Sequence, residues 1–290
     1  MPLKVGFVAI AGLPNAGKST LLNRLLGESL AITSPKPQTT RDRIVGIRTD
    51  EHAQMVFLDT PGLVDPAYEL HVRMRRTAER ALQDADAIMY VADATRGAPP
   101  PLARLVNPAL TVRAPVVTVL NKADLLSPAT RAELASSLTP AVLVSAVTGE
   151  GIDAVLATVT GLLPVGPMLY SADELTTLPT RFFAAEFVRE AALDQLDDEV
   201  PYSVACVIEE FRESRSPIYI RATLYVERDS QKRILIGTGG ARIRELGRAA
   251  RQRIEALVGA PVYLDLWVKV QPHWRREPHL LDRLGYRLTE

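Results

Sequence analysis

Apolar runs and amphipathic stretches alternate through the first half of the chain. Runs of aliphatic residues occur at 5–10, 55–58, 115–120 and 142–144, and helix-like segments follow at 20–26 and 151–161. Strands that alternate with helices predict a mostly parallel sheet covered on both faces. The loops at the carboxyl ends of such strands converge at one edge of the sheet.

One feature departs from the parallel pattern. The turn residues at 50–52 lie between the apolar runs 44–48 and 55–58. Two strands joined by so short a turn form a hairpin, so we expect one antiparallel strand at the sheet edge.

The second half of the chain has a different order of elements. An amphipathic helix is predicted over 181–196, strands near 202–211 and 218–226, a helix over 241–258 and a last strand over 262–270. A Pro- and Gly-rich segment separates this part from the first. We therefore predict an α/β domain over 1–163, a linker over 164–180 and an α+β domain over 181–290.

Composition limits the functional classes. The chain has 290 residues, of which 47% are hydrophobic and 23% charged, enough for two cores. The single cysteine, Cys206, excludes a disulfide framework and is expected to be a buried apolar residue, and the four histidines lack zinc-ligand spacing. With no leader segment and no apolar run of membrane-spanning length, we expect the protein in the cytoplasm.

The segment between the first predicted strand and helix has the pattern G-x-x-x-x-G-K-S. Its backbone N–H groups would surround the β-phosphate of a nucleotide, with Lys18 on the β- and γ-phosphates and Ser19 on Mg²⁺. The predicted phosphate-binding residues are Gly12, Leu13, Pro14, Asn15, Ala16, Gly17, Lys18, Ser19 and Thr20.

A second motif selects the base. Asn121, Lys122 and Asp124 follow the buried run 115–120. The Asp124 carboxylate can accept from guanine N1–H and the 2-amino group, whereas adenine would leave it unpaired. The pattern predicts GTP and GDP as ligands, with Asn121 bracing the phosphate loop and Lys122 along the purine.

Three further segments complete the prediction. Asp59, Thr60, Pro61 and Gly62 end a strand, where Asp59 can reach Mg²⁺ through water and the Gly62 N–H can sense the γ-phosphate. Upstream, Thr40 is preferred over Thr39 as a hydroxyl that joins the Mg²⁺ shell only with GTP. Ser145 and Ala146 end another strand, and the Ala146 N–H is expected on guanine O6.

The order of these five segments resembles the GTPase domains of the translation-factor type over the first 163 residues. That resemblance implies hydrolysis of GTP to GDP and phosphate, with Lys18, Thr40, Gly62 and Asn15 as the catalytic group. Leu63 stands where signalling GTPases place a water-orienting glutamine, so slow intrinsic turnover is expected. Through Asn15 in its phosphate loop, the chain resembles the potassium-activated members of this class, and this resemblance implies K⁺ as a further cofactor.

The second domain carries a concealed basic segment. Between residues 228 and 253 the sequence has eight Arg and Lys residues but only two acidic ones, although the whole chain has a net charge of +0. A G-x-x-G turn within it would present N–H groups to a nucleic-acid backbone. The predicted RNA-binding residues are Arg228, Lys232, Ile236, Gly237, Thr238, Gly239, Gly240, Arg242, Arg244, Arg248 and Arg251.

This part resembles a type II KH domain, and a GTPase followed by KH resembles the Era family of bacterial ribosome-assembly GTPases over essentially the whole chain. The runs 226–232 and 266–270 and the tail at 274–281, which we expect to be helical, carry that likeness. It implies binding near the 3′ end of 16S rRNA and a role in 30S subunit maturation, by a mostly monomeric protein with weak peripheral membrane association. Thr238 and Gly239 stand where the family often has a basic residue, which puts one phosphate contact in question.

We hypothesise that GTP orders residues 35–41 and 60–65 and thereby favours RNA binding. Two alternatives remain open. A tRNA-modification GTPase shares Asn15 and the Thr-Thr-Arg loop, but such chains carry a C-terminal cysteine that this one lacks. An RNA-binding scaffold with a structural nucleotide is also compatible with Leu63.

Overall fold

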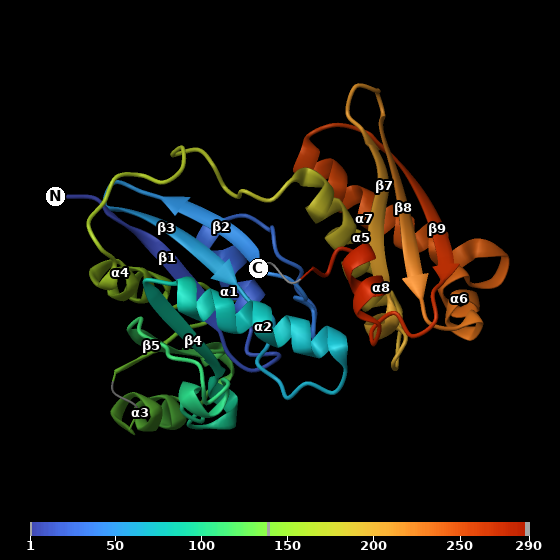
Figure 1. Ribbon diagram of the computed structural model, residues 1–290. Coiled ribbons are helices and arrows are strands. Elements are labelled where there is room, and N and C mark those ends of the chain that lie inside the picture. The colour runs from blue at the N-terminus through green and yellow to red at the C-terminus, as the bar shows by residue number, and fades with distance from the viewer. Residues whose placement is uncertain (1, 138–139, 288–290) are drawn as a thin grey trace. The chain divides into compact units, whose positions relative to one another are not determined.

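The computed structural model describes residues 2–137 and 140–287, which fall into two compact units with the division at Thr177 and Leu178 (Figure 1). The last residues of the predicted second domain, 288–290, lie outside the described residues. Each unit has its own sheet and core.

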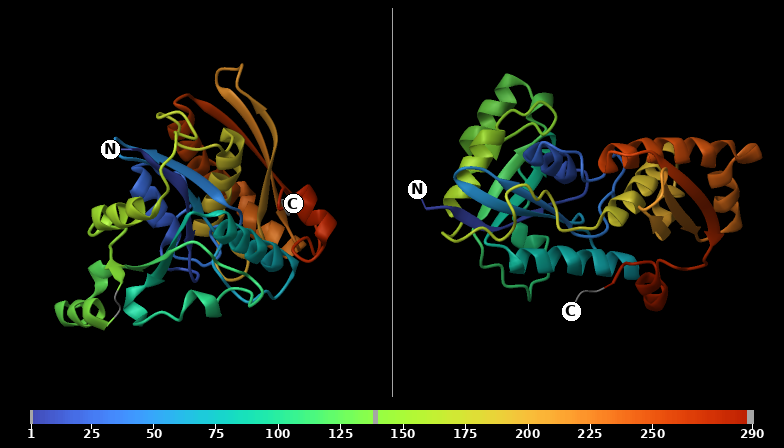
Figure 2. Two further views of the ribbon diagram at one scale, coloured as in Figure 1. Left: turned by 60° about the vertical axis from the view of Figure 1, so that its left-hand side comes forward. Right: turned by 90° about the horizontal axis from the view of Figure 1, so that it is seen from above.

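The first unit contains a six-stranded sheet in the order β2-β3-β1-β4-β5-β6. Its strands are Lys4–Ala11 (β1), Ile44–Thr49 (β2), Ala53–Asp59 (β3), Ala87–Asp93 (β4), Val116–Asn121 (β5) and Ala141–Leu143 (β6). Its helices are Lys18–Leu26 (α1), Glu69–Asp84 (α2), Pro128–Ser137 (α3) and Ile152–Leu162 (α4). Helix α1 lies on one face of the sheet and α2 on the other (Figure 2).

The pairing confirms the predicted parallel sheet with one antiparallel strand. β1 pairs in parallel with β3 and β4, and β4 with β5, whereas β2 and β3 form the edge hairpin. The hairpin turn is fixed by Asp50, whose carboxylate accepts from the N–H groups of His52 and Ala53 at 2.9 Å. Because the inner strands are parallel, Ile10 aligns with Asp59 and Asp93 with Asn121 at one edge.

The segment after α4 packs on the first unit. The Gln54 side chain accepts from the N–H groups of Leu169 and Tyr170, at 2.7 and 3.0 Å, and donates to the Tyr170 carbonyl. Further along, the Ile47 N–H donates to the Leu175 carbonyl. Most of the predicted linker is therefore held along β2 and β3.

The second unit has a three-stranded sheet in the order β7-β8-β9. Its elements are Thr180–Gln195 (α5), Ala205–Arg212 (β7), Ile218–Val226 (β8), Asp229–Ile236 (α6), Ala241–Val258 (α7), Val262–Val270 (β9) and Pro278–Arg283 (α8). β7 and β8 are antiparallel, and β8 and β9 are parallel, joined by α6 and α7. Helices α5 and α7 cover one face of the sheet (Figures 1 and 2).

Two predictions in this unit need correction. The strand expected near 202–211 begins only at Ala205, because Pro201–Ser203 form a 3₁₀ turn that a proline without an N–H can start. In the tail, only Pro278–Arg283 are helical. Cys206 is partly buried, and burial raises the pKa of its thiol, which disfavours the nucleophilic thiolate.

Trp274 anchors the tail in the core of the second unit. Its side chain is 0% exposed, its indole N–H donates to the Ser203 carbonyl at 2.9 Å, and its ring stacks on Tyr286. The only other tryptophan, Trp267, is 54% exposed.

We expect Trp274→Phe to lower the free energy of unfolding by about 1–3 kcal/mol, because it leaves a buried carbonyl without its donor and opens a small void. Urea denaturation followed by circular dichroism measures the change. The matched control, Trp267→Phe, should change stability by less than about 0.5 kcal/mol. Equal effects of the two substitutions would show that the tail is not part of the core.

Candidate functional site

The loops at the carboxyl edge of the first sheet enclose a cleft of ≈ 460 Å³. Its lining includes residues of the predicted phosphate loop, Thr39 and Thr40, Gly62 and Lys122. The parallel register places these loops together although they are up to about a hundred residues apart in the sequence.

Four buried polar side chains form the floor of this cleft. The Lys18 ammonium donates to the carbonyls of Gly12 and Leu13, at 3.3 and 3.0 Å. Ser19 Oγ donates to Asp59 Oδ2 at 2.7 Å and lies 2.8 Å from Thr40 Oγ1. The geometry thus brings Thr40, the preferred threonine, into the group with Ser19 and Asp59.

Burial shifts both charged groups toward neutrality. It lowers the pKa of Lys18 to about 8, with Asp59 acting in the opposite direction. It raises the pKa of Asp59 to about 6, opposed by Lys18 and by hydrogen bonds from Ser19 and Thr40. The protein alone therefore does not fully stabilise these charges, and a bound phosphate and cation would offset the burial.

Asp59 has one further property that fits a cation. Its Oδ1 is buried and makes no hydrogen bond to any residue that the structure describes. Together with the Ser19 and Thr40 hydroxyls it presents hard oxygen atoms, the donors that Mg²⁺ prefers. No cluster of three or more His, Cys, Asp or Glu side chains suited to a metal occurs within residues 2–137 and 140–287.

Asn121 connects three loops of the site. Its amide nitrogen donates to the Ala16 carbonyl at 2.9 Å, and its Oδ1 accepts from the Ala146 N–H at 3.0 Å. The predicted brace under the phosphate loop is thus present. Because the Ala146 N–H already donates to Asn121, it would have to be shared between Asn121 and guanine O6.

Two glycines are required by close approach. A Cβ on Gly17, whose φ is 85°, would lie 2.3 Å from the Asn121 amide nitrogen. A Cβ on Gly62 would lie 2.9 Å from Pro14 of the phosphate loop. Larger residues would push these loops apart and widen the cleft.

The base-recognition residues differ in exposure. Asp124 is exposed and lies in the 3₁₀ turn Ala123–Leu125, whereas Ser145 is fully buried and accepts at its hydroxyl from the Thr148 N–H at 3.0 Å. Asp124 is therefore available to a ligand, and Ser145 shapes the loop. Leu63 is 2% exposed and its N–H donates to the Gly12 carbonyl, so its side chain belongs to the core.

Sequence reasoning missed Asp93. Its carboxylate accepts from the Lys122 ammonium at 2.7 Å and from the Thr95 N–H and hydroxyl at 3.0 and 2.6 Å. Although partial burial acts in the opposite direction, these bonds hold the pKa of Asp93 below its ordinary value. Asp93 ends the apolar strand β4, so the rule that found Asp59 and Asn121 also applies to it.

A second cleft lies in the other unit. It measures ≈ 510 Å³ and is lined by α7 and β9, through Ile243, Arg244, Gly247, Arg248, Arg251, Tyr263, Leu264 and Leu266. The three arginines are spaced by four and three residues and share one helix face. Gly247 lets β9 approach, since a Cβ there would meet Leu266 at 3.2 Å. The sequence had not indicated Gly247 or the β9 residues.

The glycine turn lies at the N-terminus of α7. Gly237, Gly239 and Gly240 all have positive φ, at 72°, 57° and 76°, and α7 has no side-chain cap. Arg244 crosses the turn and donates to the Gly239 carbonyl at 2.8 Å. Exposed Thr238 lies at its tip.

Not all of the basic segment faces this cleft. The lining of the cleft does not include Arg228, Lys232, Ile236 or Arg242, and the Arg242 guanidinium donates to the Ile234 carbonyl. Arg253, which adds to the basic count, lies over the Phe187 ring of α5 at 4.7 Å. Fewer basic side chains therefore line the cleft than the count along the sequence suggests.

Comparison with known proteins gives matches to both units. A family model described as a 50S ribosome-binding GTPase matches residues 7–122, and a KH domain model matches residues 199–275. GTPase Era of Carboxydothermus hydrogenoformans is 40% identical over 294 residues, which cover 99% of each chain. GTPase Era of Heliobacterium modesticaldum is 41% identical and covers 98% of this chain and 97% of its own.

Two solved structures match over nearly the whole length. Era in complex with MgGDPNP and nucleotides 1506–1542 of 16S ribosomal RNA has a TM-score of 0.92 at 41% identity, covering 99% of this chain and 100% of that one. A single-residue variant of Aquifex aeolicus Era bound to GDP and AlF₄⁻ has a TM-score of 0.91 at 41% identity, with the same coverage.

We expect Asp93→Ala to weaken GTP and GDP binding by roughly tenfold, because Lys122 loses the charge-assisted hydrogen bond that holds its head in place. Dissociation constants of fluorescent GTP and GDP analogues measure this. Thr95→Val is the matched control, since it removes the hydroxyl that donates to Asp93 in the turn but leaves the Lys122 contact. If Thr95→Val weakens binding as much as Asp93→Ala does, Asp93 acts through the turn and not through Lys122.

Proposed function

Because the chain belongs to the Era family of GTPases, we propose that it couples GTP hydrolysis to binding of the 3′ end of 16S rRNA during maturation of the 30S subunit. The chain is a GTPase, which converts GTP to GDP and phosphate. The observation that carries the RNA part is the likeness over 99% of the chain to an Era solved with MgGDPNP and a 16S rRNA segment.

The nucleotide cleft supports this assignment. Ser19, Thr40 and Asp59 would hold Mg²⁺, which when bound neutralises charge that develops on the β- and γ-phosphates. Lys18 would bind the phosphates, and Asp124 would accept from guanine. Thr40 and Gly62 would position the γ-phosphate. Because buried Leu63 cannot orient the attacking water, we expect intrinsic hydrolysis to be slow.

The α7–β9 cleft supports RNA binding. Arg244, Arg248 and Arg251 line it and would contact phosphates, and the uncapped N-terminus of α7 adds N–H donors at the glycine turn. On the basis of the family assignment, the proposal includes three further points. The 30S precursor is the assembly partner, the chain is mostly monomeric, and it is located in the cytoplasm. Within the described residues no helix is long and apolar enough to cross a membrane, and peripheral membrane association stays a prediction.

We expect an RNA copied from the 3′ end of the organism's 16S rRNA to accelerate single-turnover GTP hydrolysis by about tenfold or more, because RNA binding completes a site without a glutamine. Rates are measured in K⁺ buffer with and without the RNA, and a scrambled RNA is the control. Binding without acceleration would retain both activities but reject their coupling. Failure of the matched RNA to bind would reject the RNA part of the proposal.

We expect replacement of K⁺ by Na⁺ to lower kcat at least about tenfold, because exposed Asn15, with φ of 62° at the tip of the phosphate loop, would supply an oxygen to the larger cation. Steady-state hydrolysis in matched chloride salts measures this. In Asn15→Ala the difference between the two salts should disappear. Equal kcat values for the unaltered protein in both salts would remove K⁺ from the mechanism.

A further inference from the structure

The outward face of the KH sheet, opposite α5 and α7, carries an unusual group of side chains. Alternate residues of β8 and β9 project there, among them Tyr219, Arg221, Tyr263, Asp265 and Trp267. Tyr263 and Trp267 are 58% and 54% exposed. Exposed aromatic side chains of this size need an explanation, because their burial would be favourable.

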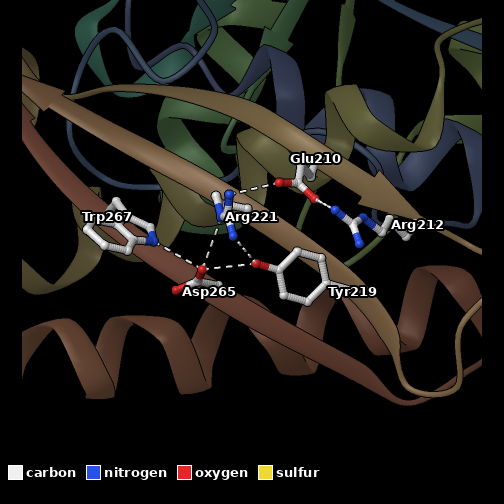
Figure 3. A network of polar contacts seen from close by, with 6 residues as sticks. All are labelled: Glu210, Arg212, Tyr219, Arg221, Asp265 and Trp267. Carbon is white, nitrogen blue, oxygen red and sulfur yellow. Dashed lines mark hydrogen bonds and ion pairs between the residues drawn. The ribbon is translucent and has the colours of Figure 1, made fainter.

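Asp265 organises this face (Figure 3). Its Oδ2 accepts from the Trp267 indole N–H at 3.0 Å, from the Tyr219 hydroxyl at 3.1 Å and from Arg221 Nε at 3.2 Å. Despite partial burial, these bonds hold the pKa of Asp265 below its ordinary value. The carboxylate stays ionised and fixes the polar edges of the rings.

The polar edge of each ring in the network is therefore already used. The indole N–H of Trp267 has its acceptor, and the Tyr219 hydroxyl donates to Asp265 and accepts from Arg221 at 2.8 Å. What Trp267 offers to a ligand is its flat π-face. Such a surface suits a nucleobase, which stacks whatever its sequence.

The charges on this face also suit an anionic ligand. Arg221 bridges Glu210, at 2.8 Å, and Asp265, and Arg212 pairs with Glu210. Both carboxylates thus have guanidinium partners, and exposed Lys269 follows on β9. Phosphates near Trp267 would meet cations and paired carboxylates, whereas Glu209, which accepts from the Tyr225 hydroxyl at 3.3 Å, places an exposed carboxylate at the Tyr225 end of the face.

Tyr263 links this face to the cleft. It lines the α7–β9 cleft beside Arg244, Arg248 and Arg251, and its ring stacks on Tyr219 with centroids 5.9 Å apart and planes 12° apart. Since β9 is the edge strand of the sheet, a chain leaving the cleft can pass over its edge to Trp267.

We propose that the outward face of the KH sheet is a second RNA surface, on which Tyr263 and Trp267 stack bases of the strand that leaves the α7–β9 cleft. This inference rests on the proposed RNA-binding function and extends it. A protein partner on the same face is the competing occupant, and the experiment separates the two.

The test compares three RNAs copied from the 3′ end of 16S rRNA with the full-length protein. One is a short single strand that binds the cleft, the second carries five further nucleotides at either end, and the third carries abasic nucleotides in those positions. We expect the extended RNA to bind at least about fivefold more tightly than the short RNA. The RNA with abasic positions should show no such gain over the short RNA.

Trp267→Ala should abolish this gain and leave the short RNA unchanged. Trp267→Phe lacks the indole N–H but keeps a stacking ring, so it should retain most of the gain in affinity. If Trp267 acted only by supporting the Asp265 network, both variants would lose the gain. Fluorescence of Trp274, the remaining tryptophan, verifies the fold. Arg248→Ala should weaken all three RNAs to a similar extent.

Several results would overturn the proposal. If Trp267→Ala retains the gain, the sheet face does not bind RNA, while the cleft function stands. If Trp267→Ala leaves RNA affinity unchanged but reduces co-sedimentation with 30S subunits, the occupant is a protein. If the unaltered protein binds none of the three RNAs, the proposed function itself fails and this inference fails with it.

Discussion

The nucleotide site depends on the side chain of Asn121. One amide group joins the phosphate loop after β1, the base-recognition loop after β5 and the loop after β6, through Ala16 and Ala146. Each loop also has hydrogen bonds of its own, such as those from Lys18 to the Gly12 and Leu13 carbonyls and from the Thr148 N–H to Ser145, but these do not fix one loop against the next. Because Asn121 both donates and accepts, the three loops keep one relative position, and Gly17 is required where the side chain passes.

Within that frame, the site holds charges that the protein itself does not satisfy. Burial shifts Lys18 and Asp59 toward their neutral forms, and Asp59 Oδ1 has no hydrogen-bond partner among the described residues. This arrangement costs stability in the absence of ligand. A phosphate and a divalent cation supply the missing partners, so the free energy of ligand binding and the stability of the domain are linked.

The two units use the same local device for different ligands. Helices α1 and α7 both follow a glycine in the left-handed region, Gly17 with φ of 85° and Gly240 with φ of 76°, and neither has a side-chain cap. Their first N–H groups are left for an external acceptor. We assign that acceptor to a nucleotide phosphate in α1 and to the RNA backbone in α7, beside the arginine row that lines the cleft.

The sequence by itself predicted the parallel sheet with its edge hairpin and the helices α1, α4, α5 and α7, and it supplied the candidate residues of the nucleotide site. These follow from local patterns: apolar runs end in polar residues, and parallel strands bring those ends together. Asp93 ends an apolar strand and could have been found by the same rule, but its contact with Lys122 depends on the pairing of β4 with β5, which is a tertiary fact. Nor did the sequence separate Arg248 from Arg253, which only the packing of α5 against α7 distinguishes. The aromatic face around Asp265 was likewise invisible, since alternation along β9 shows which residues share a face but not which strand lies beside it.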